Sequence, residues 1–276
     1  MDFILWWQTL PSKMDPTLLT IGPLSIYWYS TMYLVAFGVV YLLCGKKIKD
    51  KTFTKISLAQ LEDLLSWILI GLLVGGRLGY VLFYNLDYYL SNPLEILLPF
   101  SIQNGVWKFT GIAGMSYHGG LIGVIYAIWL YGRKVNLHLF TLADFLTASI
   151  PLGYFFGRIG NFINGELWGR PTDSVVGFLV QGTQRHATQL YEATLEGLLL
   201  FIILWLYTKK KRPSGFPAAV FLITYGCFRI FIEFFRLPDA HIGYLYGEWL
   251  TLGHLLTIPM MIFGFCIIIA NKLRVK

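Results

Sequence analysis

Two polar segments of this chain carry side chains that suit the binding of an anion. The first is the stretch 157–170, which reads GRIGNFINGELWGR and continues an apolar run. Arg158 offers a planar fork of N–H donors that matches a phosphate or a carboxylate. The polar residues after it either bind hydroxyl groups of a ligand or satisfy the loop backbone: Asn161, Asn164 and Glu166. The stretch therefore predicts an anion site in which Arg158 is the main contact.

The second segment places polar residues on one face of an apolar run. Tyr225, Arg229, Glu233 and Arg236 recur at spacings of four, four and three, which puts them on one side of a helix. A charge at mid-bilayer costs roughly 2.5–3.5 kcal/mol, so this face lines a protein interior or a wet cavity. Either Arg229 and Glu233 neutralise each other and lock two helices, or they bind a ligand. Arg236 lies nearer the membrane interface and has less need of a structural partner, so it is the better candidate for an anionic ligand.

Three further residues require a similar choice between structure and chemistry. Arg77 lies within another apolar run and either pairs with an acid of a neighbouring helix or contacts a ligand. Glu192 and Glu196 share a helical face and are first interpreted as structural acids that neutralise buried arginines. The polar set thus contains its own candidate counter-ions.

His118 is the candidate for proton transfer. It stands in the sequence MSYHGG, where a polar segment meets the next apolar run. A neutral imidazole there can take a proton from a thiol or a hydroxyl, and a purely structural histidine is the alternative. His254 lies in the last apolar run and is assigned no role. The three cysteines lie inside apolar runs without metal-binding spacing, so no metal site is predicted.

The elements that hold these residues are predicted to be transmembrane helices. Hydrophobic residues make up 56% of the chain, charged residues make up 13%, and the mean hydropathy is +0.60. A helix needs about 20 apolar residues to cross a bilayer. Seven runs are long enough, near 27–44, 61–84, 116–131, 141–157, 192–208, 216–235 and 250–271. The fold class is therefore an all-α polytopic membrane protein with about seven transmembrane helices, built as a single domain over residues 1–276.

The positive charges predict the orientation of the chain in the membrane. Fourteen of the 22 Lys and Arg residues fall at alternate junctions between the runs, in the segments 46–55, 133–134, 209–212 and 272–276. By the positive-inside rule these junctions are cytoplasmic. The N-terminus then lies outside, the C-terminus lies in the cytoplasm, and a small loop region faces outward. The net charge of +7 is accordingly a signal of topology rather than of nucleic-acid binding.

Taken together, these residues resemble the bacterial prolipoprotein diacylglyceryl transferases. The stretch 157–170 looks like the hallmark of that family in full. Similar stretches occur in order along the whole chain: Gly75-Gly-Arg77-Leu-Gly-Tyr80, His118-Gly-Gly, Gln189-Leu-Tyr-Glu192 and Arg229…Glu233-Phe-Phe-Arg236. The resemblance implies transfer of a diacylglyceryl group from phosphatidylglycerol to the lipobox cysteine of a prolipoprotein. The product is a thioether and the leaving group is glycerol phosphate.

The resemblance also implies roles for individual residues. His118 is the traditional candidate for the base, and Tyr29 is a candidate for proton transfer or positioning. The implied substrate-binding residues are Arg77, Arg158, Asn161, Asn164, Glu166, Gly169, Glu233 and Arg236. Gly169 is expected to provide a backbone geometry that a side chain would obstruct. Within this set, Arg158 and Arg236 are expected to neutralise the lipid phosphate.

The expected partners follow from the same reaction. They are phosphatidylglycerol, the prolipoprotein signal peptide with its lipobox cysteine, and membrane lipids, with no cofactor and no nucleic acid. The expected location is the bacterial cytoplasmic (inner) membrane, with the active site on the outward, periplasmic side. A membrane transporter for an organic anion is the alternative, in which the buried arginines form a binding pathway. The absence of a detectable inverted repeat and the outward position of the polar stretch favour the enzyme.

Overall fold

The chain folds mainly into helices that form two compact units. The computed structural model describes residues 3–22, 24–96, 98, 100–103, 106–109, 114–238 and 243–274. Unit 1 consists of Met1–Phe53 and Ala143–Lys276, and unit 2 consists of Thr54–Leu142.

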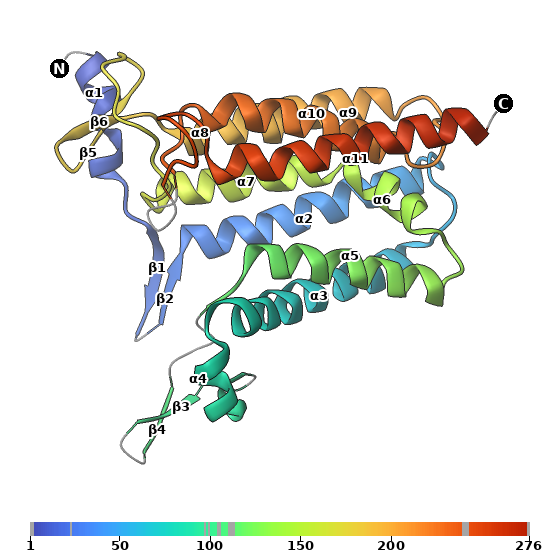
Figure 1. Cartoon of the computed structure of the whole chain (residues 1–276), viewed down its shortest axis with the longest axis horizontal. Helices are drawn as coiled ribbons and strands as arrows, with labels where there is room; N and C mark the ends of the chain where they lie inside the picture. Colours follow the sequence, from blue (N-terminus) through green and yellow to red (C-terminus); the bar gives the residue numbers. More distant parts are fainter. Residues whose placement is uncertain are drawn as a thin grey trace. The chain divides into compact units, whose positions relative to one another are not determined.

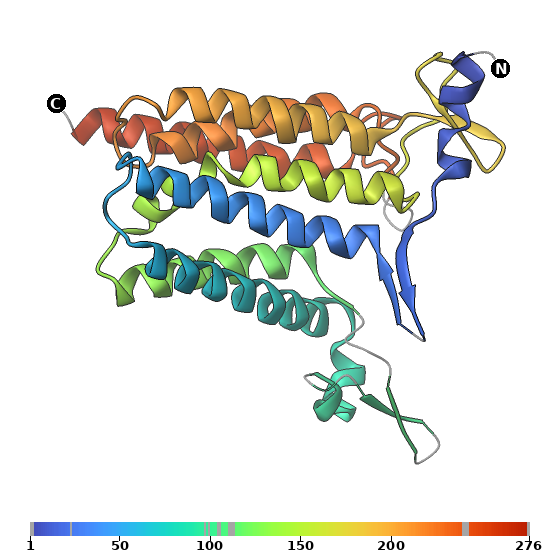
Figure 2. The same cartoon turned by 180° about the vertical axis from the view of Figure 1, so that it is seen from behind.

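Unit 1 is a group of long helices that lie side by side (Figure 1, Figure 2). They are α2 (Trp28–Lys49), α7 (Ile150–Ile163), the continuous helix α8 (Thr188–Glu192), η3 (Ala193–Leu199) and α9 (Leu200–Tyr207), α10 (Phe216–Glu233), and α11 (Leu252–Arg274). Helix α7 packs against α2 and η3, and α10 packs against α11. The segment η3 is π-helical, a rare form that often occurs at functional sites. Helix α7 is therefore placed to bring side chains between its neighbours.

Small elements gather at one end of these helices in unit 1 (Figure 1). They are α1 (Phe3–Gln8), η1 (Leu10–Lys13), the antiparallel pair β1 (Thr17–Ile21) and β2 (Leu24–Tyr27), and the antiparallel pair β5 (Phe178–Val180) and β6 (Thr183–Arg185). The ring of Trp7 lies 4.8 Å from that of Phe178, which also contacts Phe162 at the end of α7. These aromatic contacts join the small elements to the end of α7. The C-terminal end of α11 lies at the opposite end (Figure 1).

Unit 2 is built on two helices in very close contact, α3 (Leu58–Tyr84) and α5 (Tyr117–Lys134). Glycines allow this approach, because a Cβ atom at Gly75 would lie 2.7 Å from the Gly123 Cα atom. A Cβ atom at Gly79 would lie equally close, 2.7 Å, to the Gly119 Cα atom. The unit also contains α4 (Leu86–Ser91), η2 (Pro93–Ile96), and the antiparallel pair β3 (Phe100–Gln103) and β4 (Val106–Phe109). Unit 2 thus depends on backbone contact between α3 and α5.

Six of the seven predicted apolar runs each coincide with one continuous helical segment, whereas the run 141–157 covers two helices with a break between them. Among the described residues, five helices are long and apolar enough to cross a membrane, or six when a bent pair is counted as one span. The bent pair is α6 (Leu139–Thr147) and α7, which meet at 55°, with Pro151 in the first turn of α7. Helix α5 is not among the candidate spans, because polar residues such as His118, Arg133 and Lys134 lower its hydropathy. The chain is thus a polytopic helical membrane protein, whose connecting segments contain β-hairpins that the sequence analysis did not predict.

The close approach of α3 and α5 leads to a first prediction. Replacing Gly75→Ala is expected to destabilise the protein by about 1–3 kcal/mol, because the new methyl group collides with the backbone of α5. Gly38→Ala in α2 is the control, since nothing lies within 4 Å of a Cβ atom there. Thermal unfolding in lipid nanodiscs measures both. Equal midpoints for the two variants would show that the glycines do not set this helix contact.

Candidate functional site

The carboxylate of Glu192 is the centre of a buried ion network in unit 1. Its side chain is 1% exposed and lies at the C-terminal end of α8. Arg158 of α7 places its Nε atom 2.6 Å from Glu192 Oε2. Arg229 of α10 approaches Oε1 to 3.4 Å, and Arg236, just beyond α10, pairs with the same oxygen. One carboxylate therefore joins three arginines from two segments of the chain.

Two further glutamates balance the charge of these arginines. Arg229 lies 3.9 Å from Glu196 Oε1 and 3.2 Å from Glu233 Oε2, and Arg236 Nε lies 3.3 Å from Glu233 Oε2. The network thus contains three arginines and three glutamates, and formal charges cancel when all are ionised. Pairing of this kind is what an apolar interior requires, because an unpaired buried charge is very costly.

These contacts decide several of the choices that the sequence left open. The pairing of Arg229 with Glu233 is confirmed, and so is the neutralisation of buried arginines by Glu192 and Glu196. The pair Arg229–Glu233 lies within α10, and the glutamates of the neighbouring helix make the link between helices. The expectation that Arg236 has less need of a structural partner was wrong, because two glutamates contact it.

Tyr154 is a member of the site that the sequence analysis missed. Its hydroxyl donates to Glu196 Oε2 at 2.7 Å and to Glu192 Oε2 at 3.2 Å. The guanidinium of Arg158 lies 4.7 Å from the centre of its ring, one turn along α7. The spacing of four residues between Tyr154 and Arg158 is a signal that could have found it.

A chain of hydrogen bonds extends the network into the loop after α7. Arg158 Nη1 donates to Asn161 Oδ1 at 3.0 Å, and Asn161 Nδ2 donates to Glu166 Oε1 at 2.8 Å. The side chain of Gln189 donates to the Glu166 carbonyl. Asn164 is exposed at the end of α7 and lies outside this chain of contacts. The structure therefore brings Arg158, Asn161 and Glu166 together and leaves Asn164 at the surface.

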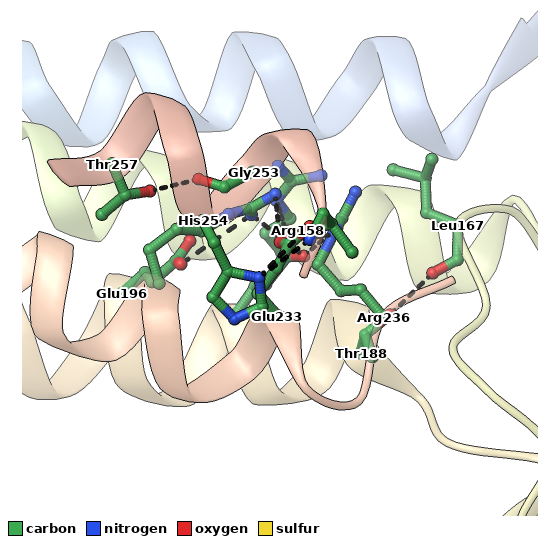
Figure 3. A network of polar contacts seen from close by, with 12 residues as sticks. Arg158, Leu167, Thr188, Glu196, Glu233, Arg236, Gly253, His254 and Thr257 are labelled. Atoms are coloured by element: carbon green, nitrogen blue, oxygen red, sulfur yellow. Dashed lines mark hydrogen bonds and ion pairs between the residues drawn. The ribbon is translucent and has the colours of Figure 1, made fainter. Parts of the chain in front are cut away.

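Gly169 and Arg170 tie the same loop to the end of α10. A Cβ atom at Gly169 would lie 2.6 Å from Thr188 Cγ2 and 3.0 Å from His186 Cβ, so there is no room for a side chain. Arg170 Nε donates to the Arg236 carbonyl at 2.9 Å. Thr188 fixes the loop from the other side by donating to the carbonyl of Leu167 at 2.8 Å (Figure 3). These contacts hold the loop against the residues that carry the ion network.

Tyr29 joins this group from the start of α2. Its hydroxyl lies 3.0 Å from that of Tyr33. Helices α2 and α7 approach closely here, because a Cβ atom at Gly160 would lie 3.4 Å from the Tyr29 Cα atom. Tyr29 is therefore positioned by unit 1 beside the last turn of α7.

Arg77 belongs to unit 2, where backbone carbonyls surround it. The residue is 7% exposed. Nε donates to Ile96 O at 2.9 Å, Nη2 to Glu95 O at 2.6 Å, and Nη1 to Gly114 O at 3.3 Å. The guanidinium also lies 4.8 Å from the ring centre of Tyr89. Donors used in this way favour a role for Arg77 as a brace between η2 and the segment before α5.

His118 also belongs to unit 2 and is the second residue of α5. It is exposed, and its ring contacts that of Tyr117. Ser116 caps the helix by accepting from the Gly119 amide at 3.2 Å, and its own amide donates to Gly76 O at 2.9 Å. The cap and the brace at Arg77 fix the start of α5. They therefore fix the backbone that carries His118.

The fold and the ion network define a class of protein, a multi-pass helical membrane protein with a partly buried arginine site that buried glutamates neutralise. Among the described residues, no group of three or more His, Cys, Asp or Glu side chains could hold a metal ion. Comparison with known proteins identifies the family. A family model described as prolipoprotein diacylglyceryl transferase matches residues 16–270, and the chain belongs to this family.

Similar relatives cover nearly the whole chain. A protein of Chlorobaculum tepidum is 45% identical over 285 residues, which cover 100% of this chain and 96% of that protein. A protein of Pseudomonas aeruginosa strain LESB58 is 45% identical, with 93% of each chain covered. One of Oleidesulfovibrio alaskensis is 46% identical, with 92% of each covered. All three are named phosphatidylglycerol–prolipoprotein diacylglyceryl transferase.

The central position of Glu192 leads to a second prediction. Glu192→Gln is expected to lower the free energy of unfolding by about 3 kcal/mol or more, because three largely enclosed arginines, 16–20% exposed, then face two carboxylates. Asp50→Asn is the control, since the Lys46–Asp50 pair is exposed and contributes about 1 kcal/mol at most. Thermal unfolding of the purified protein distinguishes them. Similar losses for both variants would contradict a structural role for the network.

Proposed function

We propose that this protein transfers a diacylglyceryl group from phosphatidylglycerol to the thiol of a lipobox cysteine in a prolipoprotein. The observation that carries this conclusion is family membership over residues 16–270, with relatives about 45% identical that are named for this transfer. The anion transporter considered above is not favoured, because these relatives are transferases. The arginines of the ion network supply the site with cations that suit a phosphate.

The chemistry of the transfer requires one bond to form as another breaks. The thiolate sulfur attacks the carbon of the diacylglyceryl group that is bonded to the phosphate oxygen, so a C–S bond replaces that C–O bond. The leaving group is glycerol phosphate, and the thiol proton passes to a base. Arg158 and Arg236 bind the phosphate in this proposal and stabilise the charge that develops on the leaving oxygen. An arginine has five N–H donors, so one that pairs with a carboxylate retains donors for the lipid.

The other candidate residues have supporting roles in this proposal. His118 takes the thiol proton, and Tyr29 positions a reacting group or transfers a proton. Asn161, Glu166 and the exposed Asn164 organise the lipid head or the acceptor peptide. Gly169 keeps the loop close to its neighbours, and Glu233 orients Arg236 of the phosphate site. For Arg77, the carbonyl contacts support the role of a brace over that of a lipid ligand.

The membrane arrangement is proposed from charge and from the helices together. We infer seven spans, with α5 as the one whose hydropathy is low, and a single domain in the bacterial inner membrane. The N-terminus lies outside, the C-terminus lies in the cytoplasm, and the site faces outward. Helix α1 and the C-terminal end of α11 lie at opposite ends of unit 1 (Figure 1). This placement supports an odd number of spans, because an odd number puts the two termini on opposite sides of the membrane. The segment 209–212, with four basic residues, supports a cytoplasmic junction between α9 and α10.

The proposed transfer is tested directly with labelled phosphatidylglycerol and a lipobox peptide. Purified wild-type protein is expected to move the labelled diacylglyceryl group to the Cys peptide and not to its Cys→Ser form. Arg158→Lys keeps the charge but loses the donor fork, so kcat/KM is expected to fall about 100-fold or more. Arg212→Lys, on an exposed segment, is the control. Absence of transfer by folded wild-type protein would refute the proposed function.

The role of His118 as base gives a prediction that depends on pH. A free cysteine thiol has a pKa of about 8.5, so the peptide is mostly protonated at pH 7 and mostly ionised at pH 9.5. His118→Ala is expected to slow kcat about 100-fold at pH 7. The difference from wild type should shrink towards pH 9.5, because the thiolate then forms without a base. If the ratio of the wild-type kcat to the His118→Ala kcat does not change with pH, His118 is not the base.

A further inference from the structure

The carboxylate of Glu233 connects the arginines of the ion network to the start of α11. Its side chain is 5% exposed, and its two oxygens have different neighbours. Oε2 faces Arg229 at 3.2 Å and Arg236 at 3.3 Å. Oε1 accepts a hydrogen bond of 2.7 Å from the hydroxyl of Thr251, which is 2% exposed. A change in the orientation of this carboxylate would therefore change its geometry toward both arginines.

Gly253 leaves the space that the carboxylate occupies (Figure 3). A Cβ atom at this position would lie 2.7 Å from Glu233 Oε2 and still closer to Cδ and Oε1. Gly253 is not among the residues with positive φ, so the backbone conformation does not explain the choice of glycine. The close approach of Glu233 does explain it, because any side chain would displace the carboxylate.

The imidazole of His254 contacts both the hydroxyl and the backbone amide of Thr251. Its Nδ1 atom lies 3.1 Å from Thr251 Oγ1 and 3.3 Å from the Thr251 amide nitrogen. The imidazole is 4% exposed, and its centre lies 4.9 Å from that of the Phe234 ring. A packed ring of this kind restricts the position of the threonine hydroxyl.

We propose that Thr251, Gly253 and His254 form a socket that positions Glu233, and through it Arg229 and Arg236, of which Arg236 binds the lipid phosphate in the proposed function. We call these three residues the Glu233 socket. They are positioning residues, because they act on the substrate through Glu233. The inference rests on the proposed function for its effect on catalysis, whereas the coupling of Thr251 to Glu233 can be tested without any substrate.

The first test compares two substitutions of Thr251. Thr251→Val keeps the shape and removes the hydroxyl, and it is expected to raise the KM for phosphatidylglycerol roughly tenfold, the loss typical of a hydrogen bond to a charged group. The KM for the lipobox peptide should stay within about twofold of wild type, and Thr251→Ser should restore both values. Thr257→Val on the same helix is the matched control, because the Thr257 hydroxyl donates to the backbone carbonyl of Gly253 at 2.7 Å.

The KM values separate positioning from a general loss of structure. A merely structural role would lower the active fraction, and hence kcat, while both KM values stayed unchanged. That result, or equal effects of Thr251→Val and Thr257→Val, would overturn the proposal. Gly253→Ala should reproduce the higher KM for phosphatidylglycerol, because the methyl group displaces the same carboxylate.

The second test is a double-mutant cycle on the ligand-free protein, read by thermal unfolding. The cycle compares the unfolding midpoints of wild type, Thr251→Val, Glu233→Gln and the variant with both substitutions. The loss of midpoint caused by Thr251→Val should be about halved in that background, because a hydrogen bond to a neutral acceptor is roughly half as strong. Additive losses would overturn the socket. This cycle requires no transfer activity. If wild-type protein transfers no diacylglyceryl group, the proposed function is refuted, and the cycle still decides whether Thr251 is coupled to Glu233.

Discussion

The buried carboxylate of Glu192 is the constraint on which the rest of unit 1 depends. It contacts three arginines in an apolar interior, so α7, α8 and the end of α10 must all approach within ion-pair distance. An unpaired charge there would cost several kcal/mol, which makes every partner obligatory. The π-helical segment η3 follows directly and places Glu196 against Tyr154, which also contacts Glu192. Close packing of Gly197 on Phe155 keeps η3 and α7 together.

The polar stretch 157–170 acts as one physical unit. Arg158 belongs to the ion network, and Asn161 forms hydrogen bonds with both Arg158 and Glu166. Gly169 allows the loop to approach His186 and Thr188. Arg170 returns to the end of α10 through the Arg236 carbonyl. Residues that give the stretch its family resemblance therefore also fix the loop after α7 against the end of α10. Their arrangement explains why so much polarity is tolerated in an apolar chain.

The predictions from sequence succeeded where the information is local. Long apolar runs specify helices in a membrane, and the spacing of Arg229, Glu233 and Arg236 specifies a shared face. The contacts of Arg77 could not be predicted, because its acceptors are backbone carbonyls, which any residue supplies. Thr251 was also missed, since its link to Glu233 depends on the packing of α10 against α11. The hairpins were missed because short strands give weak patterns beside long apolar helices.

The charge balance of the network affects both substrate binding and product release in the proposed reaction. Three arginines and three glutamates leave the site without net formal charge, so a bound phosphodiester adds one negative charge to it. The leaving glycerol phosphate is a monoester, which carries about −1.5 to −2 charges near pH 7. The network carries no net charge, so in the proposed reaction directed N–H donors, and not a surplus of positive charge, hold the lipid. For the same reason, the more highly charged product meets no surplus of positive charge that would retain it.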